Sequence, residues 1–300
     1  MFRMASKVIS MTVFLLFGAL TLTACTGDSD DVTTPAETQP PLESIEQLPP
    51  AEPADFPTIA DEDLPLLDGS LFEPLKDAPL TLLQLTPVAP GEELLVLHTT
   101  MGDVTLRLFP DEAPQAVENF VTHARNGYYD GITFHRVIPE FMIQGGCPLG
   151  TGTGGESIWG SPFGLEPSLN LRHFRGALAM AHAGGAMGSQ FYIVQNSAID
   201  PGFMNEMQEI INSQNMPMGR FENGQRIYVR DVFSVQEANY FMENGGTPFL
   251  DWLWNPQGHT VFGHVVEGMD VVDAIATVAT QPGDRPVEDV IINNISFITR

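Results

Sequence analysis

Short apolar runs separated by turn residues dominate the chain from residue 92 onward, and this pattern predicts β-strands. Residues 94–99 and 104–109 are two such runs, and the turn residues at 101–103 between them predict a hairpin. Further strands are expected at residues 132–138, 141–144, 177–181, 191–195, 261–266 and 290–298. Many short strands with few helices favour a closed antiparallel barrel, because closure removes exposed strand edges.

Two amphipathic segments predict helices that frame this barrel. The first begins with Asp111 as its N-cap and Pro114 in its first turn, and Asn126-Gly127 ends it. The second is expected at residues 269–276. The apolar face of the first helix consists of Val117, Phe120, Val121 and Ala124.

The strand pattern is interrupted between about residues 197 and 246. Apolar residues recur there at helical spacing, which predicts an inserted helical lobe within a single folded domain at residues 91–300. The lobe either shapes access to a site or simply stabilises the domain, and the sequence leaves both open. The residues at helical spacing are Phe203, Met207, Ile210 and Ile211, then Val235, Ala238, Tyr240 and Phe241.

The first 24 residues have the plan of a signal peptide. Arg3 and Lys7 precede an apolar run at residues 8–20, which is shorter than the roughly 20 residues of a membrane-spanning helix. Residues 22–25, Leu-Thr-Ala-Cys, resemble a bacterial lipobox, which implies cleavage before Cys25 and lipidation of its thiol. We therefore expect an extracytoplasmic lipoprotein that is anchored to a membrane through Cys25; the alternative is an ordinary signal peptide with an incidental cysteine.

Residues 25–90 are rich in Pro, Thr, Asp and Glu, with Lys76 as the one basic residue. Such a segment buries too little apolar surface to offset its ordering entropy, so an extended acidic tether is expected. The whole chain has a net charge of −25, which disfavours nucleic acid as a partner. The only other cysteine is Cys147, and with Cys25 lipidated no intramolecular disulfide is expected.

Residues 134–146, FHRVIPEFMIQGG, closely resemble the central signature of cyclophilins, which are peptidyl-prolyl cis/trans isomerases. Four further cyclophilin motifs follow in the family's order, at residues 152–155, 176–181, 188–193 and 258–263. Five motifs in register are far more specific than one. The resemblance implies a closed eight-stranded antiparallel barrel capped by two helices, with residues 197–246 as the inserted helical lobe. It also implies peptidyl-prolyl isomerase activity, and together with the signal peptide this predicts acceleration of X-Pro rotation in secreted or envelope proteins, which assists their folding.

The resemblance assigns roles to individual residues. Arg136 matches the catalytic arginine, and Gln144 and Gln190 match glutamines that hold the substrate backbone. A fixed, permanently charged guanidinium suits this reaction, because the prolyl nitrogen regains a lone pair when the amide twists. The remaining substrate-binding positions are Phe141, Met142, Ala181, His182, Ala183, Tyr192, Phe249, Leu250 and His259.

Some positions depart from the family pattern. His182 and Tyr192 stand where the family commonly has Asn and Phe. Phe249 is aligned with the position where the family has a tryptophan, and in another alignment register Trp252 or Trp254 would occupy that position. The register decides whether cyclosporin binds well. No metal or cofactor is expected, and the protein is expected to be a monomer that binds proline-containing polypeptides. The competing hypothesis is a chaperone-like module that binds Pro-containing segments without catalysis.

Overall fold

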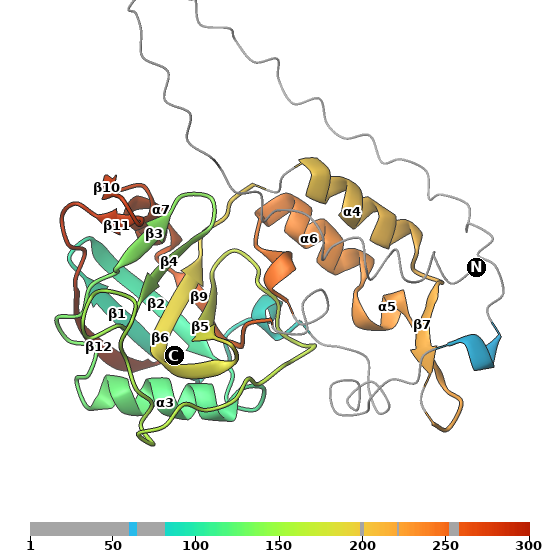
Figure 1. Ribbon diagram of the computed structural model, residues 1–300, viewed down its shortest axis with the longest axis horizontal. Coiled ribbons are helices and arrows are strands. Elements are labelled where there is room, and N and C mark those ends of the chain that lie inside the picture. Colours follow the sequence, from blue (N-terminus) through green and yellow to red (C-terminus); the bar gives the residue numbers. More distant parts are fainter. Residues whose placement is uncertain (1–59, 65–81, 199–200, 221, 252–257) are drawn as a thin grey trace, which may run out of the picture. The chain divides into compact units, whose positions relative to one another are not determined.

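The computed structural model describes residues 60–64, 82–198, 201–220, 222–251 and 258–300. Its main feature is an eight-stranded antiparallel sheet with the strand order β12-β1-β2-β9-β5-β6-β4-β3 (Figure 1). The predicted hairpin is confirmed, because β1 and β2 pair from Leu95↔Leu106 to Thr99↔Gly102. The strands are β1 Glu93–Thr99, β2 Gly102–Leu108, β3 Arg136–Ile138, β4 Met142–Gly145, β5 Ala177–Ala183, β6 Ala186–Val194, β9 Val261–Glu267 and β12 Ile292–Thr299.

The sheet curls into a half-barrel, and the prediction of a closed barrel is wrong. Strands β12 and β3 form its two edges and do not pair with each other as a ladder. Between them the predicted strand at residues 132–138 is regular only from Arg136 onward, and one isolated bridge, Thr133↔Ile291, spans the gap. A three-residue edge strand offers too few backbone groups to complete the ladder.

Five α-helices lie in the described part of the chain, and two of them make the main helix contacts with the sheet. Helix α3 (Pro114–Arg125) contacts β6, β9 and β12, and α7 (Met269–Ala276) contacts β2, β3 and β4. Figure 1 shows them at opposite ends of the half-barrel. The bounds predicted for the second helix are confirmed.

The N-cap predicted for α3 is wrong. The cap position is Ala113 rather than Asp111, and no side chain of the cap residue accepts a hydrogen bond. Instead, the Glu166 carboxylate accepts from the backbone N–H groups of Gln115 and Ala116, at 2.9 and 2.8 Å. A carboxylate from a distant loop therefore satisfies the free donors of the first turn.

The two faces of the sheet carry different clusters. On β6, Phe191 and Ile193 belong to the core of the half-barrel, whereas Tyr192 and Val194 lie in a second cluster on the other face. This is the period-two alternation of a strand. The second cluster contains Phe109, Met142, Leu171, Ala177, Ala179, Tyr192, Val194 and Val261.

The insertion forms a small lobe with its own apolar core. The predicted helical segments are confirmed as α4 (Pro201–Asn212) and α6 (Val235–Asn244). The sequence pattern missed the short hairpin of β7 (Pro217–Arg220) and β8 (Arg226–Tyr228), and the four-residue helix α5 (Val229–Val232). The lobe core contains Phe174, Met207, Ile210, Val229, Phe233, Ala238 and Phe241.

A short stretch that precedes β1 docks on the domain. Residues Leu83–Leu85 form a single 3-10 turn, η3, and Gln84 is buried there. The Gln84 amide accepts from the backbone N of Arg172 at 2.7 Å and donates to its carbonyl at 2.8 Å. The segment expected to be a tether therefore contacts the domain at residues 83–85.

The predicted signal peptide, Cys25 and most of residues 25–90 lie outside the described residues. So do Trp252 and Trp254, on which the alternative register depends. Within the ranges that the structure describes, no helix combines the length and apolar character that a membrane crossing requires.

Candidate active site

Three side chains expected in the site lie in one row across neighbouring strands. Arg136 on β3 pairs with Gln144 on β4, and Gln144 pairs with Tyr192 on β6. Paired residues project from the same face of a sheet, so the row lies on the outer face, opposite the core of the half-barrel. The outer cluster continues the row through Ala179, which pairs with Tyr192.

The Arg136 side chain is 44% exposed and has one acidic neighbour that the sequence analysis missed. Its Nε lies 3.5 Å from Oδ2 of Asp284, in the turn between β10 (Thr280–Gln281) and β11 (Arg285–Pro286). The backbone carbonyl of Asp284 also accepts from Val137 N at 2.8 Å. Asp284 has a φ of 62°, which is uncommon for a residue other than glycine. Because Asp284 is far from Arg136 in sequence, no local signal could have identified it.

The two glutamines expected to hold a peptide backbone contact each other. Gln144 Nε2 donates to Gln190 Oε1 at 3.0 Å. Gln190 Nε2 in turn donates to the carbonyl oxygens of Gly152 and Gly154, at 2.9 and 2.7 Å. The glycine-rich loop therefore fixes the amide of Gln190 through its backbone.

The chain directly after β4 approaches β6 closely because Gly146 lacks a side chain. Gly146 has a φ of +83°, and a Cβ placed on it would lie 2.4 Å from the carbonyl oxygen of Ser189. No residue with a Cβ fits this approach without movement of the backbone. The second glycine of the Gln-Gly-Gly motif is thus explained by geometry.

An apolar cluster lies on the same face of the sheet as Arg136. Met142 and Tyr192 are buried members of it, and Phe141 and Leu250 are half-buried against them. Phe249 is 45% exposed and stacks on Phe141, with ring centroids 6.1 Å apart. The structure thus brings Phe249 and Leu250 to the same place as the motif residues, although they come from the far end of the insertion.

Tyr192 belongs to a buried polar chain that the sequence analysis did not identify. Its hydroxyl lies 3.0 Å from His173 Nε2, and His173 Nδ1 lies 2.6 Å from Asp251 Oδ1. Burial, together with the Asp251 charge, raises the pKa of Tyr192 well above its usual value. The hydroxyl therefore keeps its proton at neutral pH. The two ring nitrogens of His173 connect this hydroxyl to the Asp251 carboxylate.

His259 lies against this chain. Its Nδ1 is 3.1 Å from the Met180 carbonyl, and its ring is 4.2 Å from that of His182 and 5.3 Å from that of Tyr192. Burial, followed by the neighbouring His182, lowers the pKa of His259 to about 4, despite the opposing effect of the Met180 carbonyl. His259 is therefore neutral at pH 7 and acts as a packing and hydrogen-bonding group.

Ala181, His182 and Ala183 lie at the end of β5. Strand β9 pairs with β5 only at Ala177–Ala179, whereas β6 continues along β5 as far as Ala183↔Ala186. The edge of β5 at residues 181–183 that faces away from β6 thus carries no strand of the described chain. An extended peptide can pair at such an edge.

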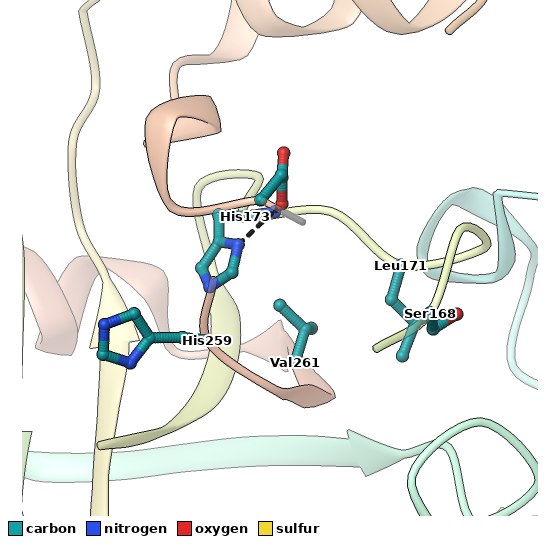
Figure 2. Close-up of a pocket in the computed structure, with 6 residues that line it drawn as sticks. Ser168, Leu171, His173, His259 and Val261 are labelled. Carbon is teal, nitrogen blue, oxygen red and sulfur yellow. Dashed lines mark hydrogen bonds and ion pairs between the residues drawn. The ribbon is translucent and has the colours of Figure 1, made fainter. Parts of the chain in front are cut away.

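A small pocket lies between the segment at residues 168–173 and the start of β9. Figure 2 shows His173, His259, Val261, Leu171 and Ser168 around it, with His173 hydrogen-bonded to the Asp251 carboxylate. Within the described part of the chain, no group of three or more His, Cys, Asp or Glu side chains is arranged to hold a metal ion. Cys147, to which the sequence analysis gave no role, is a free and buried thiol.

This arrangement suits a reaction that needs binding and electrostatic stabilisation. A guanidinium is a permanent cation with several donors, and beside an apolar cluster it can stabilise a lone pair that appears only in a transition state. The buried Met142 and Tyr192 provide the apolar surroundings. A planar amide is more polar than a twisted one, so these surroundings also favour the twisted form.

Comparison with known proteins finds relatives of a single family. The family model "Cyclophilin type peptidyl-prolyl cis-trans isomerase/CLD" matches residues 94–297. A protein of Staphylococcus saprophyticus named "Putative peptidyl-prolyl cis-trans isomerase" is 46% identical over 72% of this chain and 97% of its own length. A protein of the same name from Staphylococcus aureus is 47% identical over 69% of this chain and 93% of its own.

The fold is also found among solved structures. The crystal structure of a Cryptosporidium parvum cyclophilin type peptidyl-prolyl cis-trans isomerase superposes with a TM-score of 0.50 at 24% identity. The match covers 70% of this chain and 99% of that one. It shows the similarity of the fold.

Proposed function

This chain belongs to the cyclophilin-type peptidyl-prolyl cis-trans isomerases, and we propose that Arg136 is its catalytic residue, on the outer face of the half-barrel. The observation that carries the proposal is the row of Arg136, Gln144 and Tyr192 across β3, β4 and β6. It brings one permanent cation, one backbone-binding amide and one pocket wall to neighbouring positions on a single face.

The proposed mechanism is preferential binding of the twisted amide. Rotation about an X-Pro bond costs roughly 18–20 kcal/mol, because it breaks the resonance of the amide. Arg136 donates to the prolyl nitrogen, whose lone pair is basic only while the bond is twisted, so the interaction lowers the barrier. No proton is transferred and no covalent bond forms.

The other predicted residues are proposed to hold the peptide. Phe141, Met142, Tyr192 and Leu250 surround the proline ring, and His259 closes the pocket beside Tyr192. Gln144 and Gln190 hold the peptide backbone, and the neighbouring Ala181, His182 and Ala183 pair with the extended chain. Phe249 covers the rim by stacking on Phe141.

The test is the cis-to-trans isomerisation of a short Ala-Pro peptide by the purified protein and by Arg136→Ala. We expect kcat/KM to fall on the order of 100- to 1,000-fold in the variant, the range for the loss of a transition-state donor. Arg125→Ala is the matched control, because it removes an arginine from an exposed ion pair on α3. A folded parent that binds the peptide without accelerating isomerisation would favour the chaperone-like binding module.

We further propose that the protein works outside the cytoplasm as a lipoprotein, where it assists the folding of secreted or envelope proteins. The support is the sequence of residues 1–25, which ends in Leu-Thr-Ala-Cys. Mass spectrometry of the mature N-terminus checks this: a diacylated Cys25 is expected, and Cys25→Ser should abolish the modification. An unmodified N-terminus after cleavage elsewhere would reject the lipid anchor.

A further inference from the structure

Residues 171–174 present alternate side chains to two different parts of the molecule. Leu171 and His173 line the small pocket of Figure 2 and lie against Tyr192 and its cluster. Arg172 and Phe174 point the other way and are buried in contact with the inserted lobe. This alternation is that of an extended segment, so the pocket and the lobe are attached to opposite sides of the same short piece of backbone.

On the lobe side, a buried ion pair holds this segment. Arg172 Nη2 lies 2.8 Å from Glu237 Oε1, with the side chains 1% and 2% exposed. Nη2–H donates to the Val232 carbonyl at 2.7 Å. Oε1 of Glu237 accepts no hydrogen bond, so its contact with Arg172 is an ion pair without an aligned hydrogen bond. The other oxygen of Glu237 accepts from Ser234 N at 2.6 Å, which ties the carboxylate to the first turn of α6.

The backbone and Phe174 strengthen the same attachment. Thr247 N donates to the His173 carbonyl at 2.8 Å, and Phe174 forms an isolated bridge with Gly246. The Phe174 ring lies 4.6 Å from the rings of both Tyr240 and Phe241 on α6. The segment is thus fixed to the lobe by charge, backbone and aromatic contacts.

On the pocket side, the side chain of His173 connects the segment to the Tyr192 hydroxyl. His173 is 1% exposed and bridges Asp251 and Tyr192. The Asp251 carboxylate also accepts from the backbone N of His173 at 2.8 Å, which fixes the main chain and the ring together. Asp251 directly follows Leu250, at the point where the chain returns from the lobe to the sheet.

We propose that the inserted lobe is a positioning element of the isomerase site, in which the Arg172–Glu237 pair fixes the segment that carries His173, and His173 fixes Tyr192 in the wall of the proline pocket. The inference rests on the proposed function, because it takes Tyr192 as a pocket residue. Arg172, Glu237 and His173 do not touch the peptide and are positioning residues. They set how well a prolyl peptide is bound, whereas Arg136 sets how fast it turns over.

The deciding experiment measures KM and kcat separately for Glu237→Gln. If the substitution displaces Tyr192 in the pocket wall, KM should rise on the order of 10-fold, with kcat unchanged. This is the size of effect seen for residues that orient a site without touching its ligand. A merely structural role would reduce the folded fraction, which lowers apparent kcat and leaves KM unchanged. Arg226→Gln breaks a partly exposed lobe ion pair with Asp61 and is the matched control, for which KM should equal that of the parent.

A double-mutant cycle at the pocket end keeps the proposal testable if Glu237→Gln does not fold. His173→Gln should raise KM in the parent and much less in a Tyr192→Phe background, where the hydroxyl is missing. Additive effects, or a folded Glu237→Gln variant with the KM of the parent, would overturn the inference. The proposed function would still stand in that case, because its own test is the loss of turnover in Arg136→Ala.

Discussion

The Nε atom of Arg136 lies 3.5 Å from Oδ2 of Asp284, and the backbone carbonyl of Asp284 accepts from the residue that follows Arg136. The same residue thus fixes both the strand and the side chain of the proposed catalytic arginine. The positive φ of Asp284 fits the general tendency of backbone strain to lie near functional sites.

Asp284→Asn removes this charge, while asparagine tolerates the left-handed backbone. Both side chains of the pair are nearly half exposed, so the interaction contributes about 0.5–1 kcal/mol. Its loss should lower kcat/KM about two- to fivefold. The peptide isomerisation assay measures this. Asp289→Asn, which removes the exposed partner of Arg285, should leave kcat/KM unchanged. A loss as large as that of Arg136→Ala would contradict a positioning role.

Gly146→Ala should destabilise the protein by more than about 1 kcal/mol, because the residue has a positive φ and the new Cβ meets the Ser189 carbonyl. Urea unfolding measures the free energy of unfolding directly. Gly164→Ala is the matched control: a Cβ there meets no atom within 4 Å and the φ is not positive, so a change within about 0.5 kcal/mol is expected. Equal stability of the two variants would show that the loop moves freely away from β6.

Gln84→Ala should cost about 1–3 kcal/mol of stability. The substitution leaves the buried N–H and carbonyl of Arg172 without their partners at 2.7 and 2.8 Å. It also removes the amide that lies 3.3 Å from His264 Nδ1. Gln225→Ala, at an exposed position in the lobe, is the control and should be neutral. Equal unfolding midpoints for both variants would mean that the stretch at residues 83–85 contributes nothing to the domain.

Acid should destabilise the fold through three histidines. Burial lowers the pKa of His264, His259 and His135 to about 4, with like charges such as Arg107 near His264 adding to the effect. The unfolded chain takes up these protons near pH 6.5, before the folded protein does, so stability is full above that pH and falls as the pH drops toward about 4. Urea midpoints at pH 7.5 and pH 5 measure the loss, and His264→Gln should show less of it. An unchanged pH dependence in that variant would contradict the assignment.

Much of the fold could be predicted because its signals are local. A continuous apolar run predicted β1, alternating apolar residues predicted β2, and an amphipathic segment predicted α7 from Met269 to Ala276. The family motifs predicted that Arg136, Gln144 and Tyr192 belong together, and the strand register brings them into one row. These features depend on residues that are close in sequence or that belong to one motif.

The rest depends on contacts between distant residues. Glu166 caps α3 across some 50 positions of sequence, and the separation between His173 and Asp251 is still larger. Arg172 shows the limit most clearly, since nothing local distinguishes it from a surface arginine, yet it is 1% exposed beside Glu237. The open edge between β12 and β3 likewise depends on how many ladder bonds two distant segments can form.

The alternation along residues 171–174 also limits how the length of this region can change. Deleting or adding one residue would turn Leu171 and His173 toward the lobe, and would bring the charge of Arg172 into the apolar surroundings of Tyr192. Longer or shorter relatives should therefore differ in the turn at residues 222–225, which is exposed, and keep the spacing between Leu171 and Phe174. Spacing, as much as residue identity, is what evolution is expected to preserve here.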